Sequence, residues 1–276
     1  MEQLASGKEF RFSQQDFNKV RKILYEKAGI HLADSKDSMV YSRLARRLRA
    51  LKINSFTDYL LYLKKNDSEE QLFINSLTTN LTSFFREQHH FPILQQYLHA
   101  HPGKLRIWCA ASSTGEEPYS IAMTVADAYN SFNTPVEIIA SDIDSTVLQQ
   151  ASDGIYSVNG IKDLTNDQRK TFFHRGVGRN EGKVKVVPEL RNMVVFQQIN
   201  LTHRQWNIDA PVDVLFCRNV MIYFDKKTQI EILTRMIDLM PIDGLYVAGH
   251  SENFSNAGHL VSPLGKTVYK PVKARR

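Results

Sequence analysis

Residues 105–122 have the sequence LRIWCAASSTGEEPYSIA, and this stretch decides the fold of the chain. It opens with an apolar run at 105–109, which has the length and composition of a buried β-strand. Small residues follow at 110–115, and a helix is predicted to begin at the two acids 116–117 and Pro118. Proline suits that first turn because its missing N–H would have no intrahelical partner there. This order of elements is typical of an open α/β sheet that receives a nucleotide-like ligand at the carboxyl end of its first strand.

The same loop indicates which ligand the sheet can bind. A dinucleotide-binding fold would show G-x-G-x-x-G, but Gly115 is the only glycine here, and two acids at the helix start would repel a phosphate. Asp142 ends a second apolar run at 136–141, where an acid hydrogen-bonds a ribose hydroxyl pair. S-adenosylmethionine, an adenosine cofactor with a cation and no phosphate, fits these residues. The alternative is an ordinary strand–helix turn with helix-capping acids.

Length and composition exclude several classes of protein. The chain has 276 residues, of which 42% are hydrophobic and 23% charged, as in a soluble globular protein of one or two domains. It shows no apolar signal segment and no apolar run long enough to cross a bilayer, so we expect a cytoplasmic protein without membrane insertion. Cys109 and Cys217 lie in strand-like runs, which predicts buried, reduced thiols.

Apolar residues at helical spacing predict a helical domain over residues 1–80. Four helices are expected, at about 13–28, 37–51, 56–63 and 67–77. Gly29 is placed to end the first of them. Asp67 and Glu70 have the spacing of a capping box, which predicts the start of the fourth.

The rest of the chain alternates between strand-like and helix-like segments. Strands are predicted near 105–109, 136–141, 213–217 and 245–248, and helices at about 88–99, 117–129, 145–152 and 225–240. This alternation predicts a parallel sheet with right-handed crossovers. The run at 267–270 is predicted to add an antiparallel edge strand.

One segment, at about 155–198, interrupts the alternation. It contains a capped short helix at 165–168, a loop with three glycines at 176–182 and an alternating run at 183–187. A further apolar run follows at 194–196. We predict a small inserted β subdomain with exposed strand edges.

Four sequence stretches together are specific to one known family. They are TTNLTSFFRE at 78–87, STGEEPYSIA at 113–122, FCRNVMIYFD at 216–225 and GHSENFS at 249–255. With them the chain resembles the chemotaxis-receptor glutamate O-methyltransferases, the CheR family. The resemblance implies an enzyme that transfers the methyl group of S-adenosylmethionine to chemoreceptor glutamates. The products are glutamyl methyl esters, which serve sensory adaptation in chemotaxis, and S-adenosylhomocysteine.

The resemblance also implies the domain layout. It predicts an α/β fold, a Rossmann-like S-adenosylmethionine-dependent methyltransferase domain at 101–276, with the β subdomain inserted at about 155–198. An all-helical domain at 1–80 precedes it, and a linker and helix at 81–100 close over the cofactor.

Residues in these stretches, and Asp142 at the end of the second predicted strand, take on roles by the same resemblance. Asn80, Thr82 and Arg86 are expected to close over the methionine end of the cofactor. Glu117 is expected at its charged end, and Asp142 at its ribose.

Further residues are implied on the other side of the site. Asn200 and Leu201 resemble the contacts to the adenine. Arg218 and Asn219 are expected to bind the cofactor, and with Tyr223 they lie where a loop at the sheet edge should face the methyl group.

The reaction explains these residue types. A methyl group leaves a sulfonium by in-line displacement, so the protein chiefly aligns the reactants and excludes water. A glutamate, with a reference pKa of about 4.3, is already ionised near pH 7 and needs no general base. Arg86 and Tyr223 are predicted to position the transfer centre, with Arg218 as a third candidate. The alternatives are a surface role for Arg86, a helix-dipole role for Glu117 and a core role for Tyr223.

Charge is distributed unevenly along the chain. Residues 1–86 carry 15 Lys and Arg against 10 Asp and Glu, a net charge of +5 out of +6. Arg43, Arg46 and Arg47 on the second helix are predicted to dock the acidic methylation region of a helical receptor bundle, or else form an ordinary solvated face. The resemblance also implies a second contact, because in some members of the family the inserted β subdomain binds a receptor C-terminal peptide as an added strand. The loop at 176–182 and the run at 183–187 are compatible with such binding, and the sequence leaves open whether this chain has it.

Rival functions remain at this point. One is a nucleic-acid methyltransferase, although the excess charge is modest and its catalytic signatures are absent, so no nucleic-acid partner is expected. Another is a module that senses S-adenosylmethionine without turnover. The histidines show no metal-ligand spacing, so no metal is predicted; His89-His90 are expected to begin a helix, and only His250 lies in a family motif. A monomer is the default expectation.

Overall fold

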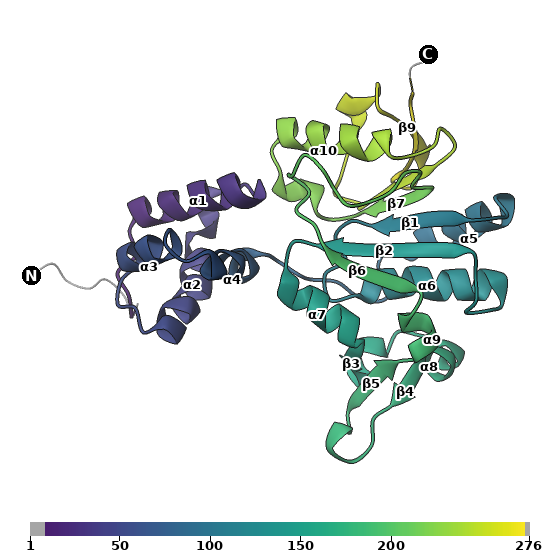
Figure 1. Ribbon diagram of the computed structural model, residues 1–276, viewed down its shortest axis with the longest axis horizontal. Coiled ribbons are helices and arrows are strands. Elements are labelled where there is room, and N and C mark those ends of the chain that lie inside the picture. The colour runs from purple at the N-terminus through teal and green to yellow at the C-terminus, as the bar shows by residue number, and fades with distance from the viewer. Residues whose placement is uncertain (1–8, 274–276) are drawn as a thin grey trace, which may run out of the picture. The chain divides into compact units, whose positions relative to one another are not determined.

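The computed structural model describes residues 9–273, which form two compact units (Figure 1). The first unit runs to Thr79 and includes Tyr223–Asp225. The second contains Asn80–Ile222 and continues from Lys226. Among residues 9–273, no helix combines the length and apolar character that a membrane crossing requires.

The first unit is helical, and the four predicted helices are confirmed. They are α1 (Gln14–Ala28), α2 (Asp37–Leu51), α3 (Phe56–Leu63) and α4 (Asp67–Leu77), with a short 3₁₀ turn, η1 (Asp34–Lys36), before α2. Ser13 caps α1 through a capping box with Asp16, and Gly29 ends it at φ 68°, donating its N–H to the carbonyl of Tyr25. Their apolar faces form a core that includes Phe17, Val20, Leu24, Leu44, Leu48, Phe56 and Phe73.

The predicted capping box at the start of α4 is wrong. Asn66 is the N-cap residue and Asp67 is already helical. The Asn66 side chain donates to the carbonyl of Tyr62, 2.7 Å away, and does not cap the helix. Glu70 instead pairs with Lys27 of α1, with 2.6 Å between Nζ and Oε2.

The second unit is built on a seven-stranded sheet in the order β6-β2-β1-β7-β8-β10-β9. Its strands are β1 (Leu105–Cys109), β2 (Val136–Asp142), β6 (Val194–Gln198), β7 (Val214–Cys217), β8 (Leu245–Ala248), β9 (Val261–Gly265) and β10 (Val268–Pro271). The first five are parallel, as predicted. The connecting helices are α5 (His90–Ala100), α6 (Glu116–Tyr129), α7 (Ser145–Asp153) and α10 (Lys226–Asp238), with short turns η4 (Met221–Tyr223) and η5 (Ser255–Ala257).

Both faces of the central strands are covered, which explains their unbroken apolar runs. Helices α5 and α6 pack together, and α6 lies against β2 and β6. Ile107 and Cys109 face this side and join its core, whereas Trp108 packs against Trp206 and donates to Ser141 Oγ. Both free cysteines are buried, as predicted.

The inserted segment forms a second sheet of three strands, in the order β3-β5-β4. Its elements are β3 (Ile155–Ser157), η2 (Val158–Ile161), α8 (Asn166–Phe172), β4 (Phe173–Arg175), η3 (Gly178–Asn180), β5 (Lys183–Val186) and α9 (Pro188–Arg191). Two expectations need correction. The run at 194–196 belongs to β6 and pairs in parallel with β2 at the edge of the main sheet. The run at 183–187 forms the central strand β5, which has partners on both sides and therefore no free edge.

The C-terminal strand is also placed differently from the prediction. β10 is antiparallel to both β8 and β9, so it is an interior strand and β9 is the edge. The sequence of β9 gave no strand signal because it contains Pro263 and four of its five residues are exposed. Proline is tolerated in that position because an edge strand leaves one row of N–H groups unpaired.

Candidate functional site

The carboxyl ends of the five parallel strands meet at one edge of the main sheet. The chain passes from β1 outward through β2 to β6, and then returns to β7 and β8 on the other side of β1. The edge between β1 and β7 is therefore the topological switch point, where open α/β sheets bind their ligands. The loops that reach it are residues 110–115, 142–144, 199–206, 218–220 and 249–252.

A buried guanidinium lies at this switch point. Arg218 follows β7 and is 4% exposed. Its Nη1 is 2.6 Å from Glu117 Oε2, and its Nη2 is 3.5 Å from Glu87 Oε2 and donates to the carbonyl of Arg86 at 2.5 Å. The second oxygen of Glu117 accepts from the Cys109 thiol at 3.3 Å. One cation is thus held between two carboxylates.

The two carboxylates differ in their electrostatic surroundings. Burial raises the pKa of Glu117, and Arg218 offsets only part of that effect. Burial also acts to raise the pKa of Glu87, but Arg218 and the hydrogen bonds from His250 and Asn219 together hold it below its usual value. Since two acids share one buried guanidinium, the cluster is suited to a ligand with positive charge.

The loop after β1 is tightly packed around Gly115. This residue has φ 99°, and an added Cβ would lie 2.8 Å from the Ala151 Cβ and 2.7 Å from the Tyr156 hydroxyl. The glycine therefore permits close packing of the loop on α7 and the inserted subdomain. At this position the close neighbour of the loop is therefore another part of the protein.

Asp142 is fixed at the end of β2, as predicted from its position. Its Oδ2 accepts from the Ser113 N–H at 2.8 Å and its Oδ1 from the Asp144 N–H at 3.0 Å. Burial raises the pKa of Asp142 to about 6. Asn80 reaches the same place, because its side chain donates to Asp144 Oδ2 at 2.9 Å and its carbonyl accepts from Ser113 Oγ at 2.9 Å.

Asn200 and Leu201 follow β6 in a loop held by two residues that the sequence reasoning missed. Trp206 donates its indole N–H to the carbonyl of Asn200 at 3.2 Å. Arg235 donates to the carbonyl of Leu201 at 3.0 Å, and its guanidinium lies 4.7 Å from the centre of the Trp206 ring. The one available signal was that Trp206 is among only two tryptophans in the chain.

The linker approaches the site through its backbone. Arg86 is half-buried, its carbonyl accepts from Arg218, and its own guanidinium donates to the carbonyl of Leu81 at 3.0 Å. Thr82 is also half-buried. Phe85 and Glu87, on either side of Arg86, have left-handed backbones with φ 51° and 55°. Glu87 was missed as a site residue although it lies within the TTNLTSFFRE motif.

Tyr223 belongs to the first compact unit. Its carbonyl accepts from the His31 N–H at 2.8 Å, and the Asp225 carboxylate nearby in sequence accepts from the Tyr25 hydroxyl at 2.7 Å. The structure describes Tyr223 only within this unit. Its role at the transfer centre stays a prediction.

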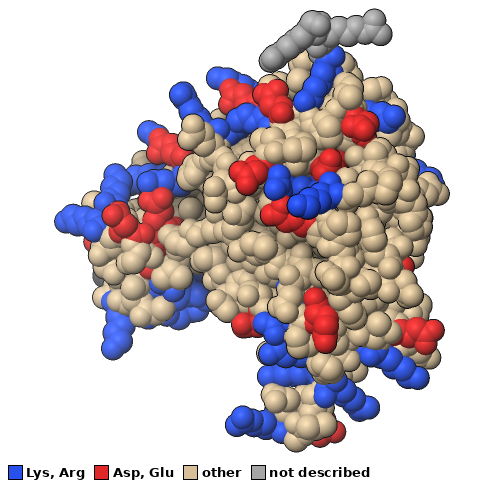
Figure 2. All heavy atoms as spheres, turned by 45° about the vertical axis from the view of Figure 1, so that its right-hand side comes forward, with Lys and Arg blue, Asp and Glu red and all other residues tan. Residues whose placement is uncertain are grey.

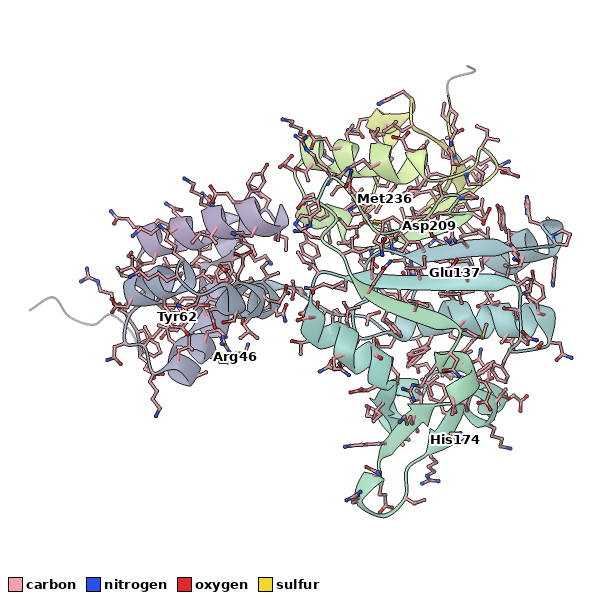
Figure 3. All side chains as sticks on the ribbon, viewed as in Figure 1. Arg46, Tyr62, Glu137, His174, Asp209 and Met236 are labelled. Carbon is pink, nitrogen blue, oxygen red and sulfur yellow. The ribbon has the colours of Figure 1, made fainter. Side chains whose placement is uncertain are left out.

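The three arginines predicted to bind a partner have different surroundings. Arg47 forms a two-bond ion pair with the buried Glu69, at 2.9 and 2.7 Å, and Tyr59 donates to the same carboxylate. The alternative of an ordinary solvated face does not hold for Arg47, because its charge neutralises a buried acid. Arg43 donates to the carbonyl of Thr78, and Arg46 is exposed (Figure 3).

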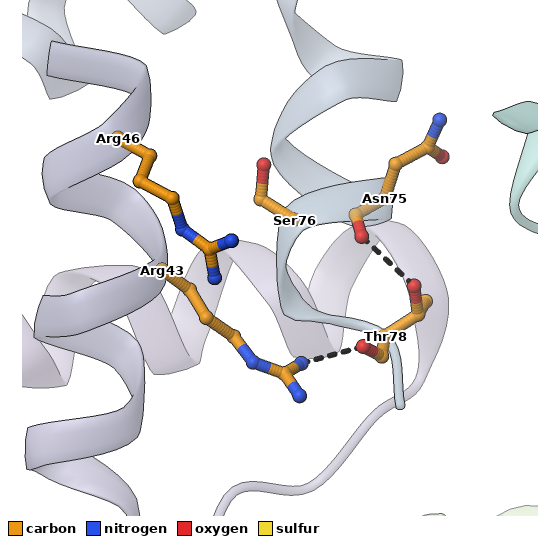
Figure 4. Close-up of a pocket in the computed structure, with 5 residues that line it drawn as sticks. All are labelled: Arg43, Arg46, Asn75, Ser76 and Thr78. Carbon is orange, nitrogen blue, oxygen red and sulfur yellow. Dashed lines mark hydrogen bonds between the residues drawn. The ribbon is translucent and has the colours of Figure 1, made fainter. Parts of the chain in front are cut away.

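A pocket beside these arginines is lined only by cationic and neutral polar side chains (Figure 4). The lining residues are Arg43, Arg46, Asn75, Ser76 and Thr78. Burial and the neighbouring charge of Arg46 lower the pKa of Arg43. An anionic group would relieve that repulsion.

The residues present at the sheet edge fit S-adenosylmethionine. Glu117 and Glu87 suit its cationic groups, and Asp142 suits its ribose. Three buried atoms at this edge have no hydrogen-bond partner in the described chain, namely Glu87 Oε2, Ser112 Oγ and Arg218 Nε. Unpaired buried polar atoms are rare in folded proteins and are expected where a ligand completes the hydrogen bonding.

A metal ion fits this edge poorly. Glu87, His89 and His90 place one potential ligand atom each within 4.8 Å of one another. The Arg218 guanidinium, 3.5 Å from Glu87, opposes a second cation there. Helix α5 begins at His90, as predicted.

Comparison with known proteins identifies the family of this chain and its cofactor. Two family models match, "CheR methyltransferase, all-alpha domain" over residues 15–78 and "CheR methyltransferase, SAM binding domain" over residues 80–270. The chain is 53% identical over 269 residues to Chemotaxis protein methyltransferase 2 of Pseudomonas aeruginosa, covering 96% of each chain. It is 51% identical to the Chemotaxis protein methyltransferase of Salmonella typhimurium, covering 93% of this chain and 90% of that one. For the Escherichia coli protein of the same name the identity is 50%, covering 93% and 91%. The chain therefore belongs to the CheR methyltransferase family and is an S-adenosylmethionine-dependent methyltransferase.

Proposed function

We propose that this enzyme methylates the side-chain carboxylates of specific glutamates in the cytoplasmic region of chemoreceptors. The products are glutamyl methyl esters and S-adenosylhomocysteine, and the reaction serves sensory adaptation. The observation that carries the proposal is the buried cluster of Arg218, Glu117 and Glu87 at the switch point of the sheet. It occurs in a chain about half of whose residues match chemotaxis protein methyltransferases over nearly their whole length.

The proposed reaction depends on the alignment of the methyl group with the receptor carboxylate more than on acid–base catalysis. When bound, S-adenosylmethionine supplies a methyl group on a positively charged sulfur. The receptor carboxylate is ionised near pH 7, so no side chain of this protein would have to remove a proton from it. Arg86 and Tyr223 would hold the incoming carboxylate in line, and exclusion of water would strengthen their charge contacts.

The remaining predicted residues would hold the cofactor. Asp142 keeps free lone pairs for the ribose hydroxyls, and Asn80 connects the linker to that side of the site. Glu117 and Arg218 would line the methionine end. Asn200 and Leu201, held by Arg235 and Trp206, would contact the adenine. Thr82 and Asn219 complete the proposed set.

Two surfaces are proposed for the receptor. On the helical unit, the pocket between Arg43 and Arg46 suits an acidic side chain of a receptor helix, because no acid lines it (Figure 4). Arg47 contributes only by holding α2 to Glu69.

The inserted subdomain is the second proposed surface, for a receptor C-terminal peptide. Lys and Arg gather over this subdomain, in the lower part of Figure 2. Since β5 is enclosed, an added strand would have to pair with β3 or β4.

We further propose that the enzyme is a monomer in the cytoplasm.

The test is methyl transfer from radiolabelled S-adenosylmethionine to a chemoreceptor cytoplasmic fragment. We expect base-labile label, as methyl esters give, which disappears when the methylation-site glutamates are replaced by aspartate. Cofactor binding without transfer to the receptor would contradict the proposed substrate. Transfer to nucleic acid in a parallel reaction would favour that rival instead.

A further inference from the structure

The loop after β8 is anchored firmly to the main sheet. It begins with a tight turn, in which the N–H of Glu252 donates to the carbonyl of Gly249 at 3.0 Å. Phe254, two residues further on, is buried. Its ring packs edge-on against Tyr246 of β8 and Tyr269 of β10, with ring centres 5.5 and 5.7 Å away. Glu252 therefore lies on a rigid base, because the residues around it are held by the sheet.

The Glu252 carboxylate is buried, with 5% of the residue exposed, and both of its oxygens accept backbone N–H groups. Oε1 accepts from Val220 at 2.9 Å and from Met221 at 2.8 Å, in the loop after β7. Oε2 accepts from Gly249 at 2.7 Å, in its own turn. Successive N–H groups that converge on one anion form an anion-binding concavity, and here a side chain of the protein itself fills it. The carboxylate thus joins the loops after two neighbouring strands.

The backbone of the loop after β7 is bent to meet this carboxylate. Asn219 has a left-handed backbone at φ 57°, a conformation that residues with a Cβ adopt only where their surroundings hold them in it. An added Cβ at Gly249 would lie 2.8 Å from the backbone nitrogen of Asn219, so the two loops meet without room for a side chain. Burial raises the pKa of Glu252, and backbone N–H groups of both loops offset part of that effect.

The segment that Glu252 holds connects residues assigned to the transfer centre. Arg218 directly precedes it, and Tyr223 follows Met221 by two residues. Met221 is fixed twice, because its N–H donates to Glu252 and its carbonyl accepts from the Gln229 side chain of α10 at 2.7 Å. Arg218 has an anchor of its own in its buried ion pair. The direct effect of Glu252 is therefore on the backbone between Arg218 and Tyr223.

We propose that Glu252 is a positioning residue for the methyl transfer. Its carboxylate fixes the backbone of residues 219–221, and through that backbone it sets where the side chains of the loop meet the reactants. The inference rests on the proposed function, which assigns Arg218 and Tyr223 to the transfer site. Since the protein contributes chiefly alignment to this reaction, displacement of the loop should lower the rate of transfer more than the affinity for the cofactor.

The test compares variants of the full chain in two assays. One is methyl transfer to a chemoreceptor fragment at saturating cofactor, and the other is calorimetric titration with S-adenosylhomocysteine. Glu252→Gln keeps the shape, but its amide nitrogen is a donor and cannot accept an N–H group as the second carboxylate oxygen does. We expect kcat to fall at least about tenfold and the affinity for S-adenosylhomocysteine to fall at most about threefold. Glu137→Gln, the same change at an exposed acid of β2 that pairs with Arg106, should alter neither value (Figure 3).

Hydrogen–deuterium exchange of the backbone amides gives a readout that does not depend on the substrate. In Glu252→Gln the amides of residues 219–221 should exchange at least about tenfold faster, whereas those of β1 should keep their rates. Unchanged exchange at residues 219–221 would overturn the proposal, whatever the enzyme methylates. If the unchanged protein transfers no methyl group to the receptor fragment, the proposed function fails, and the exchange experiment still decides whether Glu252 holds the loop.

A second variant keeps the proposal testable if Glu252→Gln does not fold. Glu252→Asp retains the buried charge, but its side chain is one methylene shorter and cannot reach both loops. It too should lower kcat by a larger factor than the affinity for S-adenosylhomocysteine. A kcat within about twofold of that of the unchanged protein, in either variant, would overturn the proposal. Equal proportional losses of kcat and of affinity would also overturn it, because they indicate a role in the folding of the whole site.

Discussion

Arg218 and Glu117, 101 residues apart in sequence, form a buried ion pair with 2.6 Å between Nη1 and Oε2. The pair joins the loop after β7 to the first turn of α6, and so crosses the switch point of the sheet. A buried pair gains little over apolar packing, but losing one member leaves the other charged and without compensation. We therefore expect the pair to stabilise the fold and also to contribute to cofactor binding.

Replacing Arg218 should destabilise the protein strongly. Arg218→Gln leaves Glu117 and Glu87 buried without their cation, and we expect the free energy of unfolding at pH 7 to fall by about 3–5 kcal/mol. Urea denaturation followed by circular dichroism measures this. The loss should be smaller at pH 5, where the carboxylates can protonate. If Arg218→Gln lowers the free energy of unfolding at pH 7 by less than about 1 kcal/mol, solvent compensates the charges of the two carboxylates.

Asp142 should make the stability of the protein depend on pH. Its pKa is raised by burial to about 6, above the usual value of 3.8, so the folded state binds the proton more tightly than the unfolded state. Stability should then fall as the pH rises from about 4 to 6, and the penalty should be complete above pH 6, at about 3 kcal/mol.

Asp142→Asn isolates that contribution. The asparagine has no charge to bury. The fall in the free energy of unfolding between pH 4 and 6 should therefore be smaller in the variant by about 3 kcal/mol, as denaturation at several pH values in this interval would measure. The same variant should bind S-adenosylhomocysteine more weakly, because the amide accepts fewer hydrogen bonds from the ribose. An unchanged pH profile would mean that Asp142 is solvated in the folded protein.

Local signals in the sequence predicted most of the elements, because they act within one turn or one strand. The cap of the short helix at 165–168, the stop at Gly29 and the apolar run of β1 required no knowledge of the rest of the fold. The apolar run at 194–196 marked a strand correctly, but nothing in it specified which of two sheets it would join. Strand β9 gave no pattern at all, because an exposed edge needs no alternation.

The charged partners could not be predicted, for a different physical reason. In the sequence, Arg47 resembles any arginine on a helix surface, and Glu87 resembles an acid near a helix start. Their roles depend on residues 22 and 131 positions away, Glu69 and Arg218, which only the folded chain brings near. Resemblance assigned Asn200 and Leu201 to the site, but it did not reveal Trp206 and Arg235, which hold their loop in place.

Arg46 and Arg47 should separate receptor docking from stability. Arg46→Ala, at an exposed position, should leave the free energy of unfolding within about 0.5 kcal/mol. It should lower the rate of receptor methylation and weaken the dependence of that rate on salt. Arg47→Ala should instead destabilise the helical unit by about 3 kcal/mol, because Glu69 is then buried without a partner. Equal effects of the two variants on stability would contradict the distinction between them.

Arg235 should control the affinity for the adenosine part of the cofactor through the loop that it holds. It donates to the carbonyls of Leu201 and His203 and lies over the ring of Trp206. Arg235→Ala removes these contacts and frees the loop, so we expect affinity for S-adenosylhomocysteine to fall about tenfold, the scale of one lost charged hydrogen bond. Arg235→Lys keeps the charge without the planar fork. Its affinity for S-adenosylhomocysteine should lie between that of the unchanged protein and that of Arg235→Ala.

Trp206 provides the readout for this prediction. In a Trp108→Phe background it is the only tryptophan left in the chain, and its ring lies on the same loop as Asn200. Binding of S-adenosylhomocysteine should change its emission in that background, and the titration gives the dissociation constant directly. With Arg235→Ala added, the same change should appear only at higher ligand concentration. If calorimetry detects binding but the fluorescence of the Trp108→Phe protein does not change, the adenosine binds away from this loop.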